Sequence, residues 1–346
     1  MLSCLSDECL TQKQKMGKGE MREMRRFTGR TGSKLHKMMI SVAVVSSMLV
    51  LAACGNASDE GSSASADDKL QITTTTGMIA DAAREVGGDL VEVTGLMGPG
   101  VDPHLYKASQ GDIQKLESAD VILYNGLHLE GKMSDILINI GKSKPVVQVT
   151  KDIPESELLM VPYGDSEEAD PHIWFDVEKW IQVTDTIRNA MIEEDPDNTD
   201  TYNQQADAYI EELKALHEEV KTQIASIPEQ SRVLVTAHDA FGYFGEAYDI
   251  EVAGLQGIST SAEAGASDVS ELRDFLVENK IKAVFVESSI SPKAMEAIVA
   301  GAEEKGHTVS IGGELFSDAM GPEGTEEGTY IGMVKHNTKT IVDALK

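Results

Sequence analysis

The chain has 346 residues, enough for about two domains of ordinary size, and its 41% hydrophobic content favours buried cores over a disordered polypeptide. Its 58 Asp and Glu against 30 Lys and Arg give a formal net charge of -28. This charge argues against nucleic acid or an anionic membrane surface as an electrostatic partner, and it favours attraction of cations.

The amino-terminal segment reverses this charge balance, because residues 1–53 carry nine Lys or Arg and four Asp or Glu. A basic flank at 34–37 precedes an apolar run at 38–51 that is too short to span a bilayer comfortably, and Leu51-Ala52-Ala53-Cys54 follows. This segment resembles the lipobox of bacterial lipoproteins. The resemblance implies that 1–53 is an N-terminal extension and signal peptide, and that lipid on Cys54 anchors the protein to the extracytoplasmic face of the cell membrane.

The remainder of the chain alternates between two kinds of pattern. Residues 54–68 are small, polar and acidic, which predicts a flexible tether. From residue 69, short β-rich apolar runs alternate with helical patterns, as is typical of an α/β fold with mainly parallel sheets. Strands are predicted at 70–75, 91–96, 121–125, 145–149, 232–236, 251–255, 283–287 and 307–311, and helices include 79–86, 112–118, 269–279 and 292–304.

Between the two groups of strands, residues 198–227 predict a long helix, which Pro196 precedes and Pro228 follows. Apolar residues recur there at helical spacing: Tyr202, Ala206, Tyr209, Leu213, Leu216, Val220 and Ile224. We therefore predict two α/β lobes, 69–197 and 228–346, joined by one long interlobe helix that allows less hinge motion than loose strands would. Two shorter helices would give the same pattern.

The tripeptide Asp-Pro-His occurs twice, at 102–104 and 170–172, in a chain with only eight histidines. Proline fixes its own φ and makes the preceding residue extended, so each His is presented from a stiff turn at little entropic cost. The Asp can orient the loop, or accept the second ring N–H and fix the tautomer of the imidazole. A pre-oriented imidazole is suited to binding a metal ion.

Candidate ligands follow strands in both lobes, where open α/β folds bind their ligands. His104 and His172 lie in the first lobe, His238 comes two residues after the strand predicted at 233–236, and Asp318 follows the last strand. Three imidazoles and one carboxylate converging between the lobes would form a site for a borderline divalent cation such as Mn²⁺ or Zn²⁺. Because neutral His and ionised Asp are the ligating forms, affinity should fall below about pH 6.

The other histidines receive structural interpretations. His128 also follows a strand; we expect it to pack in the core or behind the site, with a place in a nearby pocket as the alternative. We expect His217 to be solvated on the interlobe helix. His307 is expected to open a strand and His336 to lie in the terminal helix. Trp174 and Phe175, beside His172, are interpreted as an apolar wall that keeps water from the site.

Four segments, 96–106, 170–176, 236–244 and 313–321, resemble the metal-binding solute-binding lipoproteins of bacterial ABC importers, of the zinc, manganese and iron type. The similarity covers nearly all of 69–346, and within that family the chain most resembles the manganese-binding lipoproteins. The resemblance implies four metal ligands, His104, His172, His238 and Asp318, with the Asp able to bind through both oxygens. It also implies a rigid interlobe helix and an ABC permease with a separate ATPase as partners. We further expect a monomer without a catalytic cofactor.

The physiological metal is open at this point. Zinc-specific relatives often carry a His-rich loop before the second metal His, and 151–169 contains no histidine, which favours Mn²⁺. Many manganese members place Glu where this chain has His238, and three imidazoles with one carboxylate also suit Zn²⁺. Iron is a further alternative. From other classes, we considered a surface-tethered zinc hydrolase and a metal-stabilised adhesin, and we expect the chain not to be an enzyme.

Overall fold

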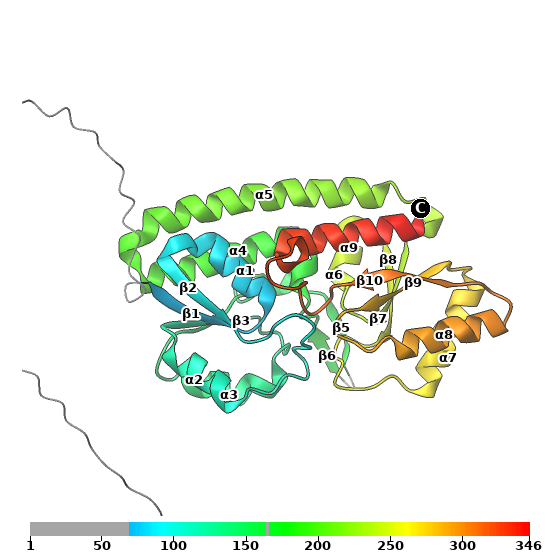
Figure 1. The fold of residues 1–346 in the computed structure, drawn as a ribbon, viewed down its shortest axis with the longest axis horizontal. Helices are drawn as coiled ribbons and strands as arrows, with labels where there is room; N and C mark the ends of the chain where they lie inside the picture. Colours follow the sequence, from blue (N-terminus) through cyan, green and yellow to red (C-terminus); the bar gives the residue numbers. More distant parts are fainter. Residues whose placement is uncertain (1–68, 164–165) are drawn as a thin grey trace, which may run out of the picture. The chain divides into compact units, whose positions relative to one another are not determined.

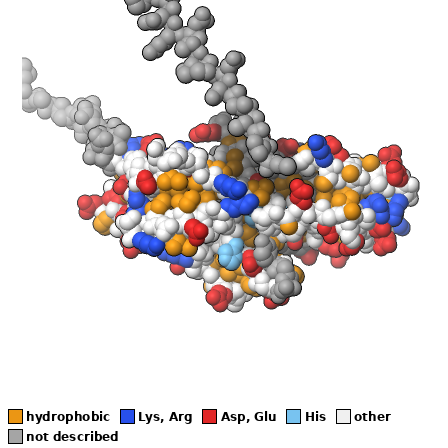
Figure 2. All heavy atoms as spheres, turned by 90° about the horizontal axis from the view of Figure 1, so that it is seen from below, with side chains coloured by type: hydrophobic (Ala, Val, Ile, Leu, Met, Phe, Trp, Pro, Cys, Tyr) orange, Lys and Arg blue, Asp and Glu red, His pale blue; other side chains and the backbone are white. Residues whose placement is uncertain are grey.

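The computed structural model describes residues 69–163 and 166–346, which form an α/β fold with helices packed around parallel strands (Figure 1). The predicted signal peptide, the tether and Cys54 lie outside the described residues. Acidic side chains are spread over the face drawn in Figure 2, with basic and apolar side chains between them. Within 69–163 and 166–346, no helix has the length and apolar character needed to cross a membrane.

The N-terminal lobe contains a parallel sheet whose strand order is β2-β1-β3-β4. The strands are β1 (Leu70–Thr74), β2 (Val91–Gly95), β3 (Val121–Tyr124) and β4 (Val146–Gln148), and the helices between them are α1 (Gly77–Gly87), α2 (Gln110–Ser118) and α3 (Ser134–Ile140). Strand β3 is an apolar run with its first three residues buried, as expected for a strand covered on both faces. The parallel arrangement puts the carboxyl ends of β1, β2 and β3 at one edge, where the loop carrying His104 begins.

Two further elements complete this lobe. An antiparallel hairpin joins β5 (Met160–Tyr163) to β6 (Ser166–Ala169), and α4 (Val177–Glu194) follows the second Asp-Pro-His turn. The Asp176 carboxylate caps α4 by accepting hydrogen bonds from the backbone N–H groups of Glu178 and Lys179. The hairpin has no clear signal in the sequence, because the Ser-Glu-Glu-Ala sequence of β6 lacks apolar alternation and is exposed or half-buried.

The long helix α5 (Thr199–Ala225) forms as one element of 27 residues. All seven residues of its predicted apolar stripe are buried. It packs against α1 and α4 of the N-terminal lobe and against α6 (Gly242–Tyr248) and α9 (Tyr330–Leu345) of the C-terminal lobe, as its course above both lobes in Figure 1 shows. The two-lobe architecture with a long joining helix is therefore confirmed, whereas the exact boundaries at 69–197, 198–227 and 228–346 stay predictions.

The C-terminal lobe is built on two parallel strand pairs. Strand β7 (Val233–His238) pairs with β8 (Glu251–Gln256), β9 (Ala283–Glu287) pairs with β10 (Ser310–Leu315), and β7 lies beside β9. Helices α7 (Ala266–Glu278) and α8 (Lys293–Glu304) pack on each other, whereas α9 packs along β10 (Figure 1). The carboxyl ends of β7, β9 and β10 bring His238, Glu287 and the segment leading to Asp318 to one edge.

One predicted strand had the wrong limits. We expected a strand at 307–311, but β10 begins at Ser310 and continues to Leu315. Gly306, with φ 82°, turns the chain, and the His307 ring bonds to the Ile281 carbonyl oxygen instead of opening the strand. The pairing of β10 with β9 shifts register between Ile311 and Gly313, so the strand continues through two glycines to Leu315.

The lobes share buried contacts beyond α5. The Trp180 ring of α4 stacks on the Tyr330 ring of α9 with centroids 5.0 Å apart. Tyr330 donates its hydroxyl proton to the Trp174 carbonyl at 2.8 Å, and the Asp81 carboxylate accepts the Tyr330 backbone N–H at 2.8 Å. Because these groups are buried and the core continues from one lobe to the other, rotation of the lobes would break packed contacts.

We expect Tyr330→Phe to lower the free energy of unfolding by about 1–2 kcal/mol, because the ring stays stacked while the buried Trp174 carbonyl loses its donor. Urea unfolding of the metal-free protein measures this change. Tyr124→Phe is the matched control, since the Tyr124 hydroxyl makes no hydrogen bond to any of the described residues. Equal stabilities of parent and Tyr330→Phe would show that this interlobe bond contributes nothing.

Candidate metal centre

The two Asp-Pro-His segments adopt the same turn. Asp102 Oδ1 accepts the backbone N–H of His104 at 2.8 Å, and Asp170 Oδ1 accepts that of His172 at 2.9 Å. In the second copy the same Asp170 oxygen also lies 2.7 Å from His172 Nδ1. The Asp of the two turns therefore has different roles. Asp102 orients only the loop, whereas Asp170 orients both the loop and the imidazole ring.

His238 is the last residue of β7, two residues later than the predicted strand end. The neighbouring strand β9 ends at Glu287, whose Oε1 accepts the His238 backbone N–H at 2.9 Å and whose Oε2 lies 2.5 Å from His238 Nδ1. Both side chains are buried. Since Nδ1 is engaged by the carboxylate, Nε2 of His238 is the atom presented to the site.

Asp318 approaches from the loop after β10. Its backbone is held by the preceding residue, since Trp174 donates its indole N–H to the Ser317 carbonyl oxygen at 3.0 Å. Within the described residues, His238 Nε2 and both carboxylate oxygens of Asp318 are buried without a hydrogen-bond partner. Buried polar atoms are normally paired, so these three atoms point to a ligand.

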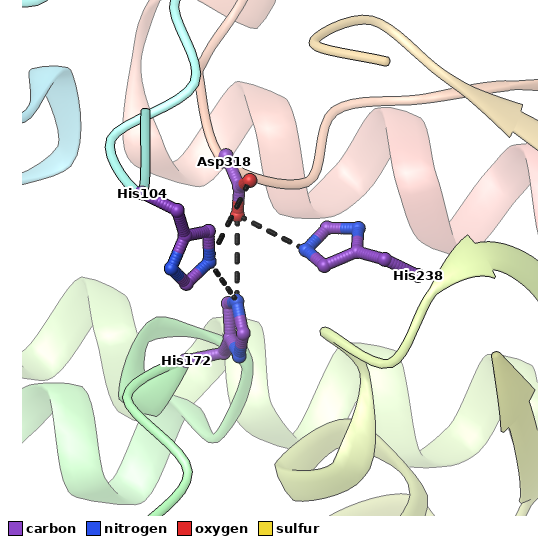
Figure 3. A group of neighbouring side chains, drawn as sticks. All are labelled: His104, His172, His238 and Asp318. Carbon is purple, nitrogen blue, oxygen red and sulfur yellow. Dashed lines mark hydrogen bonds and ion pairs between the residues drawn. The ribbon is translucent and has the colours of Figure 1, made fainter. Parts of the chain in front are cut away.

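The four predicted side chains point toward one another (Figure 3). His104 Nε2 lies 3.3 Å from His172 Nε2, and Asp318 Oδ1 lies 3.5 Å from His172 Nε2 and 3.4 Å from His238 Nε2. Asp318 Oδ2 faces His104 Nε2 at 4.0 Å. A tetrahedral site with metal–ligand bonds of about 2.1 Å has edges of about 3.4 Å, so the four groups are spaced as a small divalent cation would require.

Burial and charge set the protonation of these groups. Burial lowers the pKa of His104 to about 3. Burial also opposes the charge on His172, but the Asp170 and Asp318 carboxylates outweigh it and raise the pKa to about 9. For His238, Glu287 and Asp318 likewise outweigh burial and hold the pKa well above its usual value. Burial would raise the pKa of Asp318, but the three imidazoles hold it well below its usual range.

One contact fixes His104 across the lobes. The Thr260 hydroxyl donates to Asp102 Oδ2 at 2.6 Å, while Asp102 Oδ1 holds the His104 backbone. Thr260 belongs to the C-terminal lobe, 158 residues away in the sequence. The position of His104 is thereby coupled to the loop that follows β8.

Two further histidine predictions were wrong. His128 does not pack in the core or behind the site, because its side chain is 76% exposed and Nδ1 lies 3.1 Å from Glu168 Oε2. His217 is buried rather than solvated, and its Nδ1 lies 3.4 Å from the Tyr248 hydroxyl. Trp174 and Phe175 are buried, and the centroids of the Trp174 and His172 rings lie 5.2 Å apart. That the two aromatic residues keep water from the site stays a prediction.

A second group of potential ligands, Asp176, Glu178 and His217, lies where the N-terminus of α4 meets α5. Asp176 is committed to capping α4, and its other oxygen pairs with the Lys179 ammonium at 2.7 Å. A cation placed there would meet the positive charge of Lys179. We therefore interpret this group as structural.

The Glu287 carboxylate should control the tautomer of His238. We expect Glu287→Gln to weaken Mn²⁺ binding by about 10- to 100-fold, because an amide N–H facing Nδ1 would move the ring proton to Nε2, the proposed ligand atom. Competition with a fluorescent chelator measures the affinity. Glu296→Gln, an exposed position on α8, is the control. Unchanged affinity in Glu287→Gln would mean that the carboxylate does not select the tautomer.

Comparisons with known proteins identify the family of the chain. Residues 72–344 match the family described as ZnuA, the zinc-uptake complex component A, periplasmic. The chain is 53% identical to the manganese-binding lipoprotein MntA of Bacillus subtilis over 307 residues, which are 89% of this chain and 99% of that protein.

Solved structures are similar as well. The periplasmic zinc-binding protein TroA of Treponema pallidum superposes with a TM-score of 0.78 at 49% identity, covering 80% of this chain and 99% of that one. A Mn-bound periplasmic metal-binding protein from Candidatus Liberibacter asiaticus gives a TM-score of 0.71 at 27% identity, over 80% of this chain and 100% of that one. The chain therefore belongs to the ZnuA family of metal-binding, substrate-binding proteins.

Proposed function

We propose that this chain is the extracytoplasmic receptor of a metal importer: it captures a divalent cation, most readily Mn²⁺ in the cell, and delivers it to an ABC permease. The observation that carries the proposal is the convergence of His104, His172, His238 and Asp318, with three buried polar atoms that have no hydrogen-bond partner among the described residues. In this proposal Asp318 binds through one or both oxygens and each imidazole binds through Nε2.

The assignment of Mn²⁺ over Zn²⁺ rests on two features. The stretch 151–169 contains no histidine, and its described part contains the β5–β6 hairpin instead of a His-rich loop. The 53% identical relative is named a manganese-binding lipoprotein. The zinc alternative is supported by the tetrahedral spacing and by the zinc-binding TroA, and iron(II) suits the same ligands. By the Irving–Williams order Zn²⁺ should bind more tightly than Mn²⁺ in vitro, whichever metal is carried in the cell.

Binding rather than catalysis fits this donor set. A catalytic zinc normally has three protein ligands and one open position for water. Here a fourth protein group, Asp318, completes the tetrahedron, and the imidazoles and carboxylate are buried. We therefore propose that the chain is not an enzyme and holds no catalytic cofactor, and neither the hydrolase nor the adhesin alternative gains a specific observation from the described residues.

The partners and location follow from the same proposal. Lipid on Cys54 would hold the protein at the extracytoplasmic face of the membrane, where a permease and its ATPase receive the metal. We propose a monomer, because the two lobes already supply all four ligands within one chain. The formal net charge of -28 favours collection of cations and disfavours nucleic acid.

Native mass spectrometry of the purified protein with Mn²⁺, Zn²⁺ and Fe²⁺ tests the proposal, and we expect one tightly held metal per chain. Uptake of radioactive Mn²⁺ and Zn²⁺ by cells that lack the gene, with and without the reintroduced protein, then identifies the transported metal. A chain that binds none of the three metals would refute the receptor. Restored uptake of Zn²⁺ alone would replace manganese with zinc.

A further inference from the structure

A surface hollow leads to His104. It has a volume of about 300 Å³, and it is lined from the N-terminal lobe by His104, His128, Lys132 and Glu168 and from the C-terminal lobe by Ser259 and Ser261. Because a water molecule in the liquid occupies about 30 Å³, a cation with a full hydration shell fits there. The hollow therefore connects solvent with one of the four proposed ligands.

The hollow contains a second imidazole and a carboxylate. His128 Nδ1 lies 3.1 Å from Glu168 Oε2, with the His128 side chain 76% exposed and that of Glu168 25% exposed. Since Nδ1 is engaged by Glu168, the exposed ring leaves Nε2 for a ligand. A histidine patch reaches the surface of the face drawn in Figure 2, with acidic side chains nearby. One imidazole and one carboxylate suit the same class of divalent cation as the buried site, but with fewer ligands.

The backbone presents His128 in a fixed and unusual conformation. Gly126, Leu127 and His128 all have positive φ, at 82°, 50° and 65°. Two of these residues have side chains that disfavour this region, so the surroundings must hold the loop in place. The buried Glu130 carboxylate does so by accepting the backbone N–H groups of Asn125 at 2.8 Å and Gly126 at 3.0 Å. His128 is therefore preorganised at the surface.

A second hollow reaches the site from Asp318, between α1, β2 and residues 318–328. It is lined by the Arg84 side chain, whose positive charge opposes the passage of a cation, and by Glu323, but by no imidazole. The hollow at His104 also carries one cation, Lys132, so the two hollows differ in the presence of an imidazole and not in having a positive charge. An entry site must bind its cation weakly, because a tightly bound cation would dissociate too slowly to reach the buried ligands.

We propose that His128 and Glu168 form a low-affinity entry site, which takes a hydrated divalent cation from solvent and passes it to His104. This inference rests on the proposed metal-binding function of the buried site. An entry site lowers the barrier between solvent and the buried ligands without contributing a ligand to the final complex. Its loss should therefore slow association and dissociation by the same factor and leave the dissociation constant unchanged.

Stopped-flow mixing with Mn²⁺ and an EDTA chase measure the two rates, followed by tryptophan fluorescence because Trp174 adjoins His172. We expect His128→Ala and Glu168→Gln each to slow association about tenfold, and dissociation equally. Glu167→Gln, the exposed neighbour on β6, and His336→Ala, on α9, are the matched controls and should keep the parental rates. Parental association rates in both test variants would overturn the proposal, as would slowing by Glu323→Gln in the other hollow.

Direct binding provides the second test. A His172→Ala/Asp318→Ala double variant should lose tight binding and keep one weak Mn²⁺ site, which electron paramagnetic resonance detects and which adding His128→Ala removes. A folded double variant with no weak site would refute the entry site while leaving the receptor proposal intact. A double variant that binds as tightly as the parent would instead refute the buried site. If circular dichroism shows that the double variant is unfolded, the association and dissociation rates of His128→Ala and Glu168→Gln remain the test of the entry site.

Discussion

Replacing Asp318 with asparagine is expected to weaken Mn²⁺ binding by about 10²- to 10⁴-fold, which corresponds to the about 3–5 kcal/mol lost when one partner of a buried charge pair is removed. Asp318 is the only anion among the four proposed ligands, and it is fully buried among three imidazoles. Asparagine keeps the shape of the side chain and one oxygen acceptor, so the expected loss of Mn²⁺ affinity is due to the missing negative charge. Isothermal titration calorimetry with a competing chelator measures the affinity.

Asp207→Asn is the matched control for this variant, because it removes one exposed carboxylate on α5 and gives the same net charge. Its affinity should equal that of the parent, since a distant exposed charge is screened by salt. Thermal unfolding of the metal-free proteins should accompany the titrations, because the loss of Asp318 also removes one of the two carboxylates beside His172 and one of the two beside His238. Parental Mn²⁺ affinity in a folded Asp318→Asn protein would exclude Asp318 as a ligand.

The fold class and the four candidate ligands could be predicted because their signals are local. Apolar runs alternating with helical stripes indicate a parallel α/β sheet, and such sheets place functional residues just after their strands. The two Asp-Pro-His segments carry their own geometry, since each Asp accepts the N–H of the His two residues later. Predicting these features does not require knowing which strands are neighbours in the sheets.

The groups that hold the ligands in place depend on tertiary neighbours. Glu287 reaches His238 only because β9 lies beside β7, and Thr260 reaches Asp102 only because two loops from different lobes meet. Neither pairing has a sequence signal at fixed spacing. The exposure of His128 depends on three consecutive residues with positive φ, of which only Gly126 is of a type that predicts this conformation.

His217 was predictable from the sequence after all. It lies four residues after Leu213 and three before Val220, so it belongs to the apolar stripe of α5. Its two glutamate neighbours suggested an exposed position, but the helical spacing is the stronger signal. The ring packs against Tyr248, with centroids 5.4 Å apart.

The affinity for Mn²⁺ is expected to rise by about two orders of magnitude per pH unit between pH 6 and 8. In the metal-free protein the pKa of His172 is raised to about 9 and that of His238 lies well above its usual value, so both imidazoles carry a proton in this range. His104, with a pKa lowered to about 3, carries none. A metal ion binds neutral imidazole, so it must displace about two protons, and acid opposes binding.

This range differs from the sequence expectation that affinity falls below about pH 6. An imidazole with an ordinary pKa of about 6.5 would lose its proton before pH 8, and the affinity would hardly change between pH 7 and 8. Here the buried carboxylates Asp170 and Glu287 move the competition between metal and proton to higher pH. Titration calorimetry in buffers with different ionisation enthalpies counts the protons released, and no release at pH 7.5 would contradict these protonation states.

The exchange of about two protons for one divalent cation also leaves the charge of the buried site unchanged. In the metal-free state two imidazolium ions face Asp318, Asp170 and Glu287, and in the bound state one cation with two positive charges takes the place of those protons. Because burying additional net charge is unfavourable, such an exchange lets a fully enclosed site bind a metal ion without that penalty. Asp170→Asn tests this directly, since it should lower the pKa of His172 and reduce the number of protons released at pH 7.5 toward one.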